Sequence, residues 1–454
     1  MTIESINPAT GNILQSFSPL SPDDLEQRVE SAAKAQGSWQ KLSIEERCRP
    51  LMKIADLLEE RAESLGRIAT LEMGKPLTEA QGEIKKCAWV CRHYAENSAD
   101  YLNPQTIESD ASKSFVRYDP LGLVLSIMPW NFPFWQVFRF AAPTLMAGNG
   151  VLLKHAPNVQ QCAEAIEDLF LEAGFPKYLL SNLIIEVEPV PDLIADRRIA
   201  AVTLTGSDRA GRAVAEVAGR ALKPVVLELG GSDPFIVLDD ADIDQAVAHA
   251  IISRFLNNGQ SCIAAKRLIV VDSVHDEFVQ KFSLAMDALI LGDPLEPETR
   301  IGPLAQARFR VALHEQVQSM IREGARCVTG GVIPEGEGFY YPPTLLVDVA
   351  PDSQVIKNEI FGPVALVVRV PNRAAALELA NSVDYGLGAS VWTKDETLFD
   401  ELISKLEAGA VFVNGMVKSD PRLPFGGIKQ SGIGRELGRE GILEFVNTKT
   451  VWVA

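Results

Sequence analysis

The chain has 454 residues, 47% of them hydrophobic, which is enough to bury a large core and excludes a single small binding module. Its 43 Lys and Arg against 60 Asp and Glu give a net charge of -17, which argues against nucleic acid as a partner. The sequence shows no basic leader and no run of about 20 apolar residues, so we predict a soluble cytoplasmic protein with no membrane partner. Six cysteines without a Cys-x-x-Cys pair predict reduced thiols.

The first part of the chain, residues 21–100, has apolar positions at helical spacing and predicts a helical layer. From residue 121 onward, short apolar runs alternate with helical stretches, which is typical of parallel, doubly wound sheets. The strands expected in the first sheet are 121–128, 151–154, 183–187, 199–204 and 225–229. Those expected in a second sheet are 235–238, 267–271, 344–347, 364–370, 389–392 and 410–414.

The segment 228–234 holds turn residues and predicts a domain junction between the two sheets. The segments 103–118 and 445–453 look like strands outside either sheet and predict an arm that pairs between the subunits of a homodimer or homotetramer. Cys87 and Cys91 share a helix face, but no other ligands lie near them in sequence. We therefore predict core packing there and no metal site.

Cys262 is the first candidate for a nucleophile, because it lies in a predicted loop of small and polar residues at 257–262. A nucleophilic cysteine must reach its thiolate form, which requires exposure and a nearby proton acceptor. The other five cysteines fall in helical or apolar segments. From these residues alone, a buried free thiol is the more common alternative.

Two polar residues in apolar surroundings are candidates for acid–base and oxyanion chemistry. Glu228 lies in the apolar segment 225–231, where a carboxylate is costly and its pKa tends to rise, as it does in many general bases. Asn131 lies in a proline-flanked turn, where its amide N–H could stabilise a developing oxyanion. The alternatives are a buried glutamate satisfied by backbone donors or a lysine, and an ordinary Asx turn.

A cofactor site is indicated where the apolar run 199–204 leads into Gly206, Ser207 and a helical segment. A strand, a glycine turn and a helix N-terminus together can bind a diphosphate. The G-x-G-x-x-G fingerprint is absent, so an ordinary strand-to-helix turn is the alternative. Lys154 ends another apolar run at the sheet edge where ligands of doubly wound folds bind, and it either contacts ribose or phosphate or is simply solvated.

Taken together, these segments resemble the aldehyde dehydrogenase superfamily over essentially the whole chain. The resemblance implies an α/β fold with two doubly wound, Rossmann-like domains and a small β oligomerisation arm. Seven matches occur in order, which makes coincidence implausible. They are Pro129-Trp130-Asn131, Lys154, Thr205-Gly206-Ser207, Glu228-Leu229-Gly230-Gly231, Gly259-Gln260-Ser261-Cys262, Glu359-Ile360-Phe361-Gly362-Pro363 and Pro424-Phe425-Gly426-Gly427.

The resemblance implies NAD(P)-dependent oxidation of an aldehyde to an acid through a cysteine thiohemiacetal and a thioester. Cys262 would be the nucleophile, Glu228 the general base, and Asn131 with the backbone N–H of Cys262 the oxyanion hole. The implied cofactor contacts are Trp130, Lys154, Gly206 and Ser207 for adenosine and diphosphate, and Glu359 and Phe361 for the nicotinamide ribose and ring.

With these roles, the chain divides into three parts. We predict a dinucleotide-binding domain at 1–227, in which 103–118 belongs to the oligomerisation arm. A catalytic domain would follow at 228–430. Residues 431–454 would form a C-terminal return and an oligomerisation strand.

Within the superfamily, the chain is most similar to the shorter bacterial succinate-semialdehyde dehydrogenases. This implies succinate semialdehyde, or a similar short carboxylate-bearing aldehyde, as the substrate. Arg139 lies one helical turn from Trp135, and a substrate carboxylate would give it the partner that it lacks; an internal salt bridge is the alternative. The resemblance adds Ser261 and Ser419 as carboxylate contacts and Arg422 as a weaker candidate.

One departure from the family pattern concerns the choice of cofactor. Pro157 stands three positions after Lys154, where NAD-preferring relatives often carry an acidic residue. Without that charge a 2'-phosphate is not repelled, and Lys154, His155 and Asn158 could attract it. We therefore predict a preference for NADP, with NAD as the alternative cofactor.

Three other functions remain open from the sequence: a broad aliphatic aldehyde dehydrogenase, a CoA-acylating dehydrogenase, and a catalytically silent dinucleotide-binding protein. Water activation by Glu228 would be unnecessary in a CoA-acylating enzyme. The presence of Cys262, Glu228 and Asn131 together argues against a silent protein.

Overall fold

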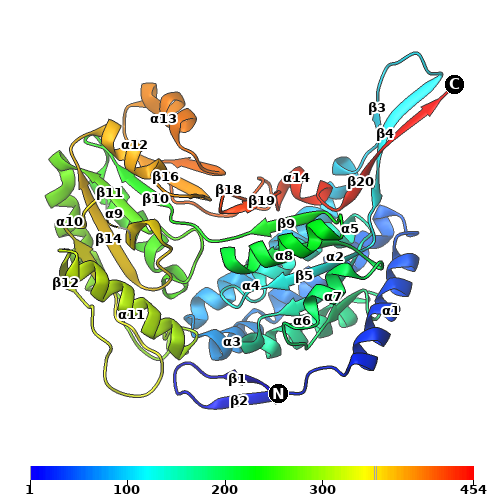
Figure 1. Ribbon diagram of the computed structural model, residues 1–454, viewed down its shortest axis with the longest axis horizontal. Helices are drawn as coiled ribbons and strands as arrows, with labels where there is room; N and C mark the ends of the chain where they lie inside the picture. The colour runs from blue at the N-terminus through cyan, green and yellow to red at the C-terminus, as the bar shows by residue number, and fades with distance from the viewer. Residues whose placement is uncertain (1, 352, 354) are drawn as a thin grey trace.

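The computed structural model describes residues 2–351, 353 and 355–454, and Figure 1 shows them as two α/β bodies lying side by side. A six-stranded sheet forms the centre of one body, and a seven-stranded sheet forms the centre of the other. A three-stranded sheet projects from the first body as an arm, with the C-terminus at its tip. The predicted fold class of two doubly wound sheets and a small β arm is confirmed.

The chain starts with a β-hairpin and continues with four helices, so the helical layer predicted for 21–100 is confirmed. Serine caps set two of the helix starts: Ser21 Oγ accepts from the N–H of Asp24, and Ser43 forms a capping box with Glu46. The hairpin strands are β1 (Ile3–Ile6) and β2 (Ile13–Phe17), and the helices are α1 (Pro22–Trp39), α2 (Ile44–Glu60), α3 (Ala62–Met73) and α4 (Leu77–Tyr101).

The first sheet has the strand order β19-β9-β8-β5-β6-β7 and is parallel except for β19. Its strands are β5 (Leu123–Met128), β6 (Gly150–His155), β7 (Leu180–Asn182), β8 (Ile199–Thr205), β9 (Val225–Glu228) and β19 (Gly432–Ile433). The helices between its strands are α5 (Trp135–Met146), α6 (Gln160–Ala173), α7 (Val190–Ala195) and α8 (Asp208–Arg220). Because parallel strands end at one edge, the segments after β5, β8 and β9 meet there.

The strand predicted at 183–187 is wrong, because the edge strand β7 lies earlier in the chain. Leu183 and Ile185 are buried in a cluster that contains side chains of the strands β5, β6, β8 and β9 as well as of helices, and the N–H of Leu183 still donates to the carbonyl of Leu153 in β6 at 2.7 Å. The carbonyl of Ile184 accepts from the N–H of Leu20 at 2.8 Å, so the backbone here pairs with the segment before α1. The apolar run therefore predicted correctly that these residues are buried, but it predicted incorrectly that they form a strand.

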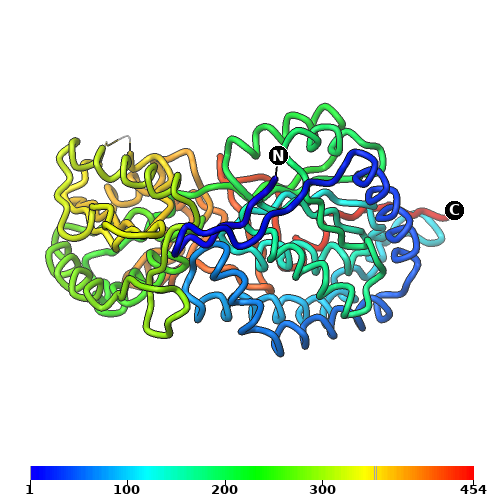
Figure 2. The backbone as a smooth tube through the Cα atoms, turned by 90° about the horizontal axis from the view of Figure 1, so that it is seen from below, coloured from blue at the N-terminus to red at the C-terminus, as the bar shows by residue number. Residues whose placement is uncertain are grey.

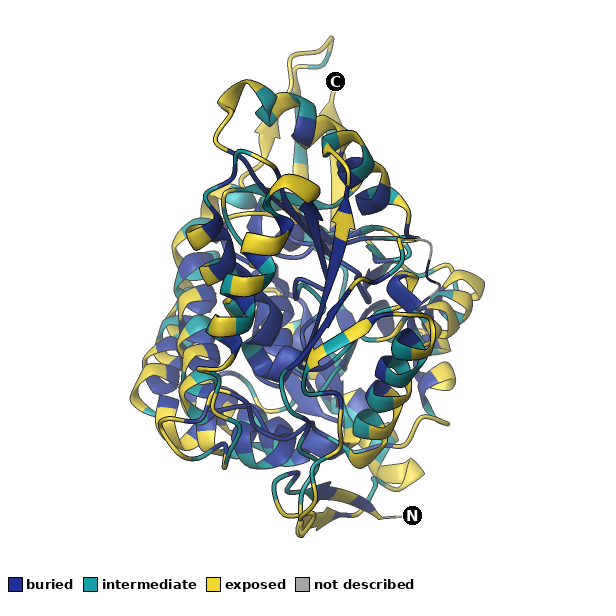
Figure 3. Cartoon of the chain, turned by 90° about the vertical axis from the view of Figure 1, so that its left-hand side faces the viewer, coloured by how far each residue is buried: buried dark blue, intermediate teal, exposed yellow. Residues whose placement is uncertain are grey.

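The second sheet has the order β12-β13-β14-β11-β10-β16-β17, and Figure 3 shows its buried strands lying between helices with exposed outer faces. All six strands predicted for it are present, whereas the edge strand β12 was missed. The strands are β10 (Pro234–Val237), β11 (Arg267–Val271), β12 (Arg326–Thr329), β13 (Thr344–Val347), β14 (Val364–Val370), β16 (Gly388–Trp392) and β17 (Ala410–Val413). The helices are α9 (Ile243–Phe255), α10 (Asp272–Met286), α11 (Ala307–Arg322), α12 (Arg373–Asn381) and α13 (Phe399–Lys405).

The arm consists of β3 (Gln105–Thr106), β4 (Lys113–Pro120) and β20 (Val446–Val453), with β20 antiparallel to β4 along its whole length. The two strands predicted outside the main sheets are thus confirmed. The helix α14 (Gly438–Leu443) precedes β20, and β15 (Tyr385–Gly386) pairs with β18 (Ile428–Lys429). The predicted domain boundary between 227 and 228 falls inside β9, and the division into domains stays a prediction.

The N-terminal hairpin bridges the two bodies. Figure 2 shows it from below, where it lies along the first body and its turn reaches the edge of the second. The carbonyl of Pro8, in the hairpin turn, accepts from the N–H of Phe339 at 2.8 Å, which fixes this crossing. No helix in the described part of the chain has the length and apolar character needed to cross a membrane.

Candidate active site

Cys262 lies in a loop between the short 3-10 helix η2 (Leu256–Gly259) and β11. Asn257 and Asn258 adopt left-handed backbone conformations with φ of 59° and 58°, which asparagine tolerates better than most residues. Gly259 also has a positive φ, and a Cβ there would lie 2.2 Å from the carbonyl oxygen of Gly362. The Asn-Asn-Gly sequence therefore creates the sharp turn that presents the thiol.

Lys266 holds this loop through hydrogen bonds to its backbone, and the sequence analysis missed it. Its Nζ donates to the carbonyl of Ser261 at 2.7 Å and to that of Cys262, and it forms an ion pair with Glu359 at 3.2 Å. The same lysine thus fixes the backbone of the predicted nucleophile and a predicted cofactor contact. A lysine just ahead of a strand gives no sequence signal for this role.

The thiol of Cys262 is half-buried, and burial raises its pKa to about 12 against the opposing charges of Lys266 and Arg139. At neutral pH the resting side chain is therefore a protonated thiol that needs a proton acceptor before it can attack. The other five cysteines line neither of the two cavities described below; they are Cys48, Cys87, Cys91, Cys162 and Cys327.

Asn131 follows β5 and is buried against the Cys262 loop. Its Nδ2 donates to the carbonyl of Gln260 at 3.1 Å, while the carbonyl of Asn131 accepts from Asn257 Nδ2 at 2.8 Å. Its Oδ1 has no hydrogen-bond partner in the described residues, so the alternative of an Asx turn is wrong. The amide is thus held next to the loop that carries the thiol.

Glu228 ends β9 and is buried, and its Oε1 has no partner in the part of the chain that the structure describes. Gly426 makes room for this oxygen, because a Cβ there would lie 2.7 Å from it. Burial raises the pKa of Glu228 well above its ordinary value, and the charge of Glu436 adds to this, while Arg139 opposes it. The raised pKa makes the carboxylate form of Glu228 a stronger proton acceptor than that of an ordinary glutamate.

Arg139 is a correction to the sequence analysis, which expected it to lack a partner. It forms a buried ion pair with Glu436, and its guanidinium lies 4.8 Å from the centre of the Phe425 ring. The alternative of an internal salt bridge is therefore what the structure contains. Glu436 lies between β19 and α14, and the fold brings it to the buried region that Arg139 of α5 occupies. The two residues are far apart in the sequence, so their spacing does not predict the pair.

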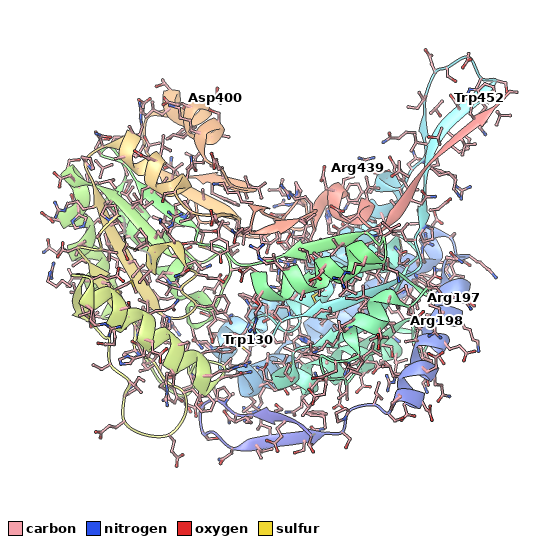
Figure 4. The ribbon with its side chains drawn as sticks, in the orientation of Figure 1. Trp130, Arg197, Arg198, Asp400, Arg439 and Trp452 are labelled. Atoms are coloured by element: carbon pink, nitrogen blue, oxygen red, sulfur yellow. The ribbon has the colours of Figure 1, made fainter. Side chains whose placement is uncertain are left out.

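A cavity of about 750 Å³ opens on one side of Cys262. Trp130 stacks on Phe309 with ring centres 4.9 Å apart and meets Phe361 edge-to-face at 5.7 Å. Figure 4 shows Trp130 between the two bodies. The predicted cofactor contacts that line this cavity are Trp130, Gly206, Ser207, Glu359 and Phe361.

The walls of this cavity fit a dinucleotide. Ser207 is the N-cap of α8, and the first N–H groups of a helix are available to bind a diphosphate. Glu359 accepts from the N–H of Gly231 at 3.2 Å and is held by Lys266, so its carboxylate is fixed at the cavity wall. A Cβ at Gly230 would lie 2.7 Å from this carboxylate, which explains the glycine.

The predicted contacts at the end of β6 and just after it are not among the residues that line this cavity. Lys154 is buried, its Nζ makes only a long 3.4 Å hydrogen bond to the carbonyl of His155, and no carboxylate of the described chain pairs with it. Pro157 starts the 3-10 helix η1 (Pro157–Val159) and is exposed. Both polar side-chain atoms of Asn158 are buried without a partner in the described residues.

His155 is a second correction, because it cannot attract a phosphate by its charge. Its Nε2 donates to the carbonyl of Pro133 at 2.8 Å, and its Nδ1 accepts from the N–H of Ala156 at 2.9 Å. Burial lowers the pKa of His155 to about 4, so the ring is neutral at physiological pH. Its role is to hold the strand end against the turn before α5.

A second cavity of about 270 Å³ opens on the other side of Cys262. It brings together all four predicted substrate contacts, which are Trp135, Arg139, Ser261 and Ser419. Arg422 does not line it; this exposed side chain pairs with Asp420 at 2.6 Å. Lys86 of α4 does line it and was missed, because one lysine on a long charged helix gives no distinguishing signal.

No group of three or more His, Cys, Asp or Glu side chains arranged to hold a metal ion is found in residues 2–351, 353 and 355–454. The two cavities that share Cys262 differ in their walls. The larger has aromatic walls and a helix N-terminus, and the smaller has basic and hydroxyl side chains.

Comparison with known proteins agrees with this arrangement. The model of the aldehyde dehydrogenase family matches residues 1–451. The chain is 52% identical, over the full length of both, to a protein of Synechocystis sp. named probable succinate-semialdehyde dehydrogenase, NADP(+). The structure of the present chain matches that of succinic semialdehyde dehydrogenase from Streptococcus pyogenes in complex with NADP+. The TM-score is 0.97, the sequence identity is 36%, and 99% of each chain is covered.

A further similar structure was determined in complex with NAD. PnpE in complex with nicotinamide adenine dinucleotide matches with a TM-score of 0.96 and 33% identity, covering 100% of this chain and 94% of that one. The family model and these full-length relatives agree with the site geometry: the chain belongs to the aldehyde dehydrogenase family and is an oxidoreductase.

Proposed function

We propose that this enzyme oxidises succinate semialdehyde to succinate with NADP. The observation that carries the proposal is that Cys262 lies on the walls of both cavities, one suited to a dinucleotide and the other a small space with basic and hydroxyl groups. A short aldehyde with a carboxylate at its far end fits the second space. When NADP is bound, its nicotinamide ring would accept the hydride that leaves the substrate.

In the first half of the reaction, Cys262 releases its proton to water and its sulfur bonds to the aldehyde carbon, whose carbonyl double bond opens to give a thiohemiacetal with a negatively charged oxygen. The Nδ2 group of Asn131 and the backbone N–H of Cys262 stabilise this oxygen as donors fixed by the surrounding loop. Lys266 keeps the loop in place through the carbonyls of Ser261 and Cys262. Loss of hydride from the same carbon leaves a thioester on Cys262.

In the second half, Glu228 accepts a proton from water, and the water oxygen attacks the thioester carbon. The carbon–sulfur bond then breaks, the acid leaves, and Glu228 returns its proton to the sulfur, which regenerates the thiol. Gly426 leaves space beside Glu228, and Arg139 stabilises the carboxylate form of Glu228. This gives Glu228 a function in releasing the acid.

Two buried groups support NADP over NAD. Lys154 has a cationic Nζ with no carboxylate partner in the described residues, and Asn158 has an unpartnered amide. Pro157 adds no negative charge between them. A 2'-phosphate near the end of β6 would give both groups a partner.

The proposal is tested by measuring kcat/KM for succinate semialdehyde and butanal, each with NADP and with NAD. We expect succinate semialdehyde to exceed butanal by about 10- to 100-fold, the contribution of a charge-assisted contact to one carboxylate. We also expect NADP to exceed NAD. Equal values for the two aldehydes would favour a broad aliphatic aldehyde dehydrogenase instead.

Replacing Asn131 with alanine should lower kcat with either aldehyde by about 10²- to 10³-fold, because one donor to the oxyanion is lost. Since this donor acts on the transition state, KM should change little. Steady-state kinetics of the Asn131→Ala and Asn131→Asp variants provide the measurement. A drop in kcat of less than about threefold for both variants would contradict this role.

We also propose that the arm joins subunits of a homo-oligomer in the cytoplasm. The strand β20 lies at the edge of the three-stranded sheet and leaves one side of its backbone unpaired within the chain. Trp452 and Val453 near its end are exposed, with 53% and 47% of their surface accessible. A domain division near residues 228 and 431 remains part of the same proposal.

A further inference from the structure

Arg254 is a buried cation close to the nucleophile, and the mechanism above gives it no role. It lies in the last turn of α9, shortly before the turn that presents Cys262, and its side chain is completely buried. A cation is favourable at the end of a helix, because it faces the negative end of the helix dipole. This explains a basic residue at the position, but not the contacts that its guanidinium makes.

The guanidinium joins two loops that are far apart in the sequence, the nucleophile loop 257–262 and the cofactor loop 359–363. Arg254 Nη2 donates to the carbonyl of Gly259 and to the carbonyl of Gly362, both at 2.7 Å. Gly362 directly follows Phe361, the predicted contact of the nicotinamide ring, which lines the larger cavity. One nitrogen atom therefore holds the loop of the thiol against the loop that is predicted to contact the cofactor.

The two loops are in direct contact at this point. A Cβ on Gly259 would lie 2.2 Å from the carbonyl oxygen of Gly362 and 2.8 Å from Arg254 Nη2, so a larger residue would push the loops apart. The carbonyl of Gly362 also accepts from the N–H of Val364, the first residue of β14, at 2.8 Å. The second sheet thus fixes the cofactor loop, and Arg254 fixes the nucleophile loop relative to it.

Lys266 makes a second link between the same two loops. As described above, it runs from the carbonyls of Ser261 and Cys262 to the carboxylate of Glu359. At the cofactor loop this link ends on a side chain, which can rotate, whereas Arg254 binds backbone carbonyls in both loops. Arg254 is therefore the contact that sets the separation of the two backbones.

Stability alone does not favour an arginine at this position. Its Nε has no hydrogen-bond partner in the described chain, and a buried cation with an unsatisfied N–H is costly. Burial lowers the pKa of Arg254 to about 10 against the charge of Glu359, so the guanidinium remains a cation at neutral pH. The carboxylate of Glu359 is itself paired with Lys266. An apolar side chain of similar length would fill the same space at a lower cost.

We propose that Arg254 is a positioning residue for hydride transfer, because it holds the carbon bonded to Cys262 at the correct distance from the nicotinamide ring. This inference rests on the proposed function. In this step the C–H bond of the thiohemiacetal breaks, its hydrogen leaves with both electrons to NADP, and the oxygen lone pair re-forms the carbonyl of the thioester. A displacement of about 1 Å is enough to slow such a step by about 100-fold.

The test compares Arg254→Met and Arg254→Lys with Arg267→Met as the matched control. Arg267 is also buried, and burial lowers its pKa to about 10 as well. Its guanidinium binds backbone carbonyls outside both loops, which belong to Ser232, Leu379 and Ala380. Neither arginine lines the two cavities at Cys262. Both substitutions remove a buried arginine, but only the loss of Arg254 releases the nucleophile loop from the cofactor loop.

Stopped-flow absorbance should follow the first turnover of succinate semialdehyde and of the same aldehyde with deuterium on its aldehyde carbon. For Arg254→Met we expect the NADPH-forming first phase to slow about 10- to 100-fold and to show a full primary isotope effect. KM for the aldehyde should change little, and iodoacetamide should label Cys262 without cofactor at the rate of the unmodified enzyme. Arg254→Lys should recover much of the lost rate, and Arg267→Met should match the unmodified enzyme.

Three results would overturn the role of Arg254: an unchanged first phase in Arg254→Met, equal slowing in Arg267→Met, or slowing without an isotope effect. The last of these would make thiol attack the slow step. Thermal unfolding shows whether each variant is folded, and Arg254→Lys provides the same test if Arg254→Met is not. If the unmodified enzyme forms no NADPH from succinate semialdehyde, the proposed function fails instead, and butanal allows the same comparison of variants.

Discussion

Replacing Cys262 with alanine is expected to lower kcat by about 10⁴-fold or more with any aldehyde, because no covalent intermediate can then form. The thiol lies where the two cavities meet, and none of the other five cysteines lines either cavity. Steady-state reduction of NADP measures the loss. Binding of NADP, followed by quenching of protein fluorescence, should persist in the variant.

Cys327→Ala is the matched control for this prediction, because Cys327 is also half-buried but lies away from both cavities. It should keep nearly all activity. The raised pKa of Cys262, about 12, adds a second readout: the thiolate fraction grows with pH, so iodoacetamide should label this thiol about tenfold faster per pH unit. Activity retained by Cys262→Ala would refute the assignment of the nucleophile.

Replacing Glu228 with glutamine is expected to separate the two halves of the reaction. Acylation of Cys262 should still release about one equivalent of NADPH per active site in a rapid first phase, whereas steady turnover should fall by about 10²- to 10⁴-fold. The reason is that an amide cannot accept the proton of the attacking water. Stopped-flow absorbance resolves the two phases.

Glu444→Gln is the control for the charge around Glu228. Glu444 raises the pKa of Glu228 through its charge, lines neither cavity, and accepts from the N–H of Arg435 at 2.6 Å, which glutamine can also do. We expect only a small change in turnover. If Glu228→Gln slows the first phase and the steady phase equally, Glu228 acts before the thioester and the proposed role is wrong.

The charged groups beneath the site form one connected system. Glu228 and Glu436 are both buried, and burial together with mutual repulsion raises the pKa of Glu228. Arg139 is the cation that lets these two carboxylates share the region. Its removal is therefore expected to affect the chemistry with every aldehyde.

The sequence by itself determined the helical layer, most strands of both sheets and the strands of the arm. Hydrophobic periodicity reports which backbone faces are buried, and it succeeded wherever an apolar run also had hydrogen-bond partners in a sheet. It failed at 183–187, because the side chains there stay buried while the backbone leaves the sheet after Leu183 and pairs through Ile184 with the segment before α1. The exposed edge strand β12 was missed because it lacks a continuous apolar run.

Sequence motifs also singled out the main candidate site residues. Cys262, Glu228, Asn131 and Ser207 lie in loops or strand ends with unusual local composition, so each could be singled out without a structure. The tertiary structure brings them to the two adjoining cavities or to the walls beside them.

Only the tertiary structure decided how the charged side chains are paired. Arg139 meets Glu436, and Lys86 meets Ser419 across 333 positions of the chain, so no local pattern predicts either contact. Burial made His155 neutral and left Lys86 without a carboxylate. The physical reason is that charge compensation depends on distance and desolvation, both of which are set by packing between distant segments.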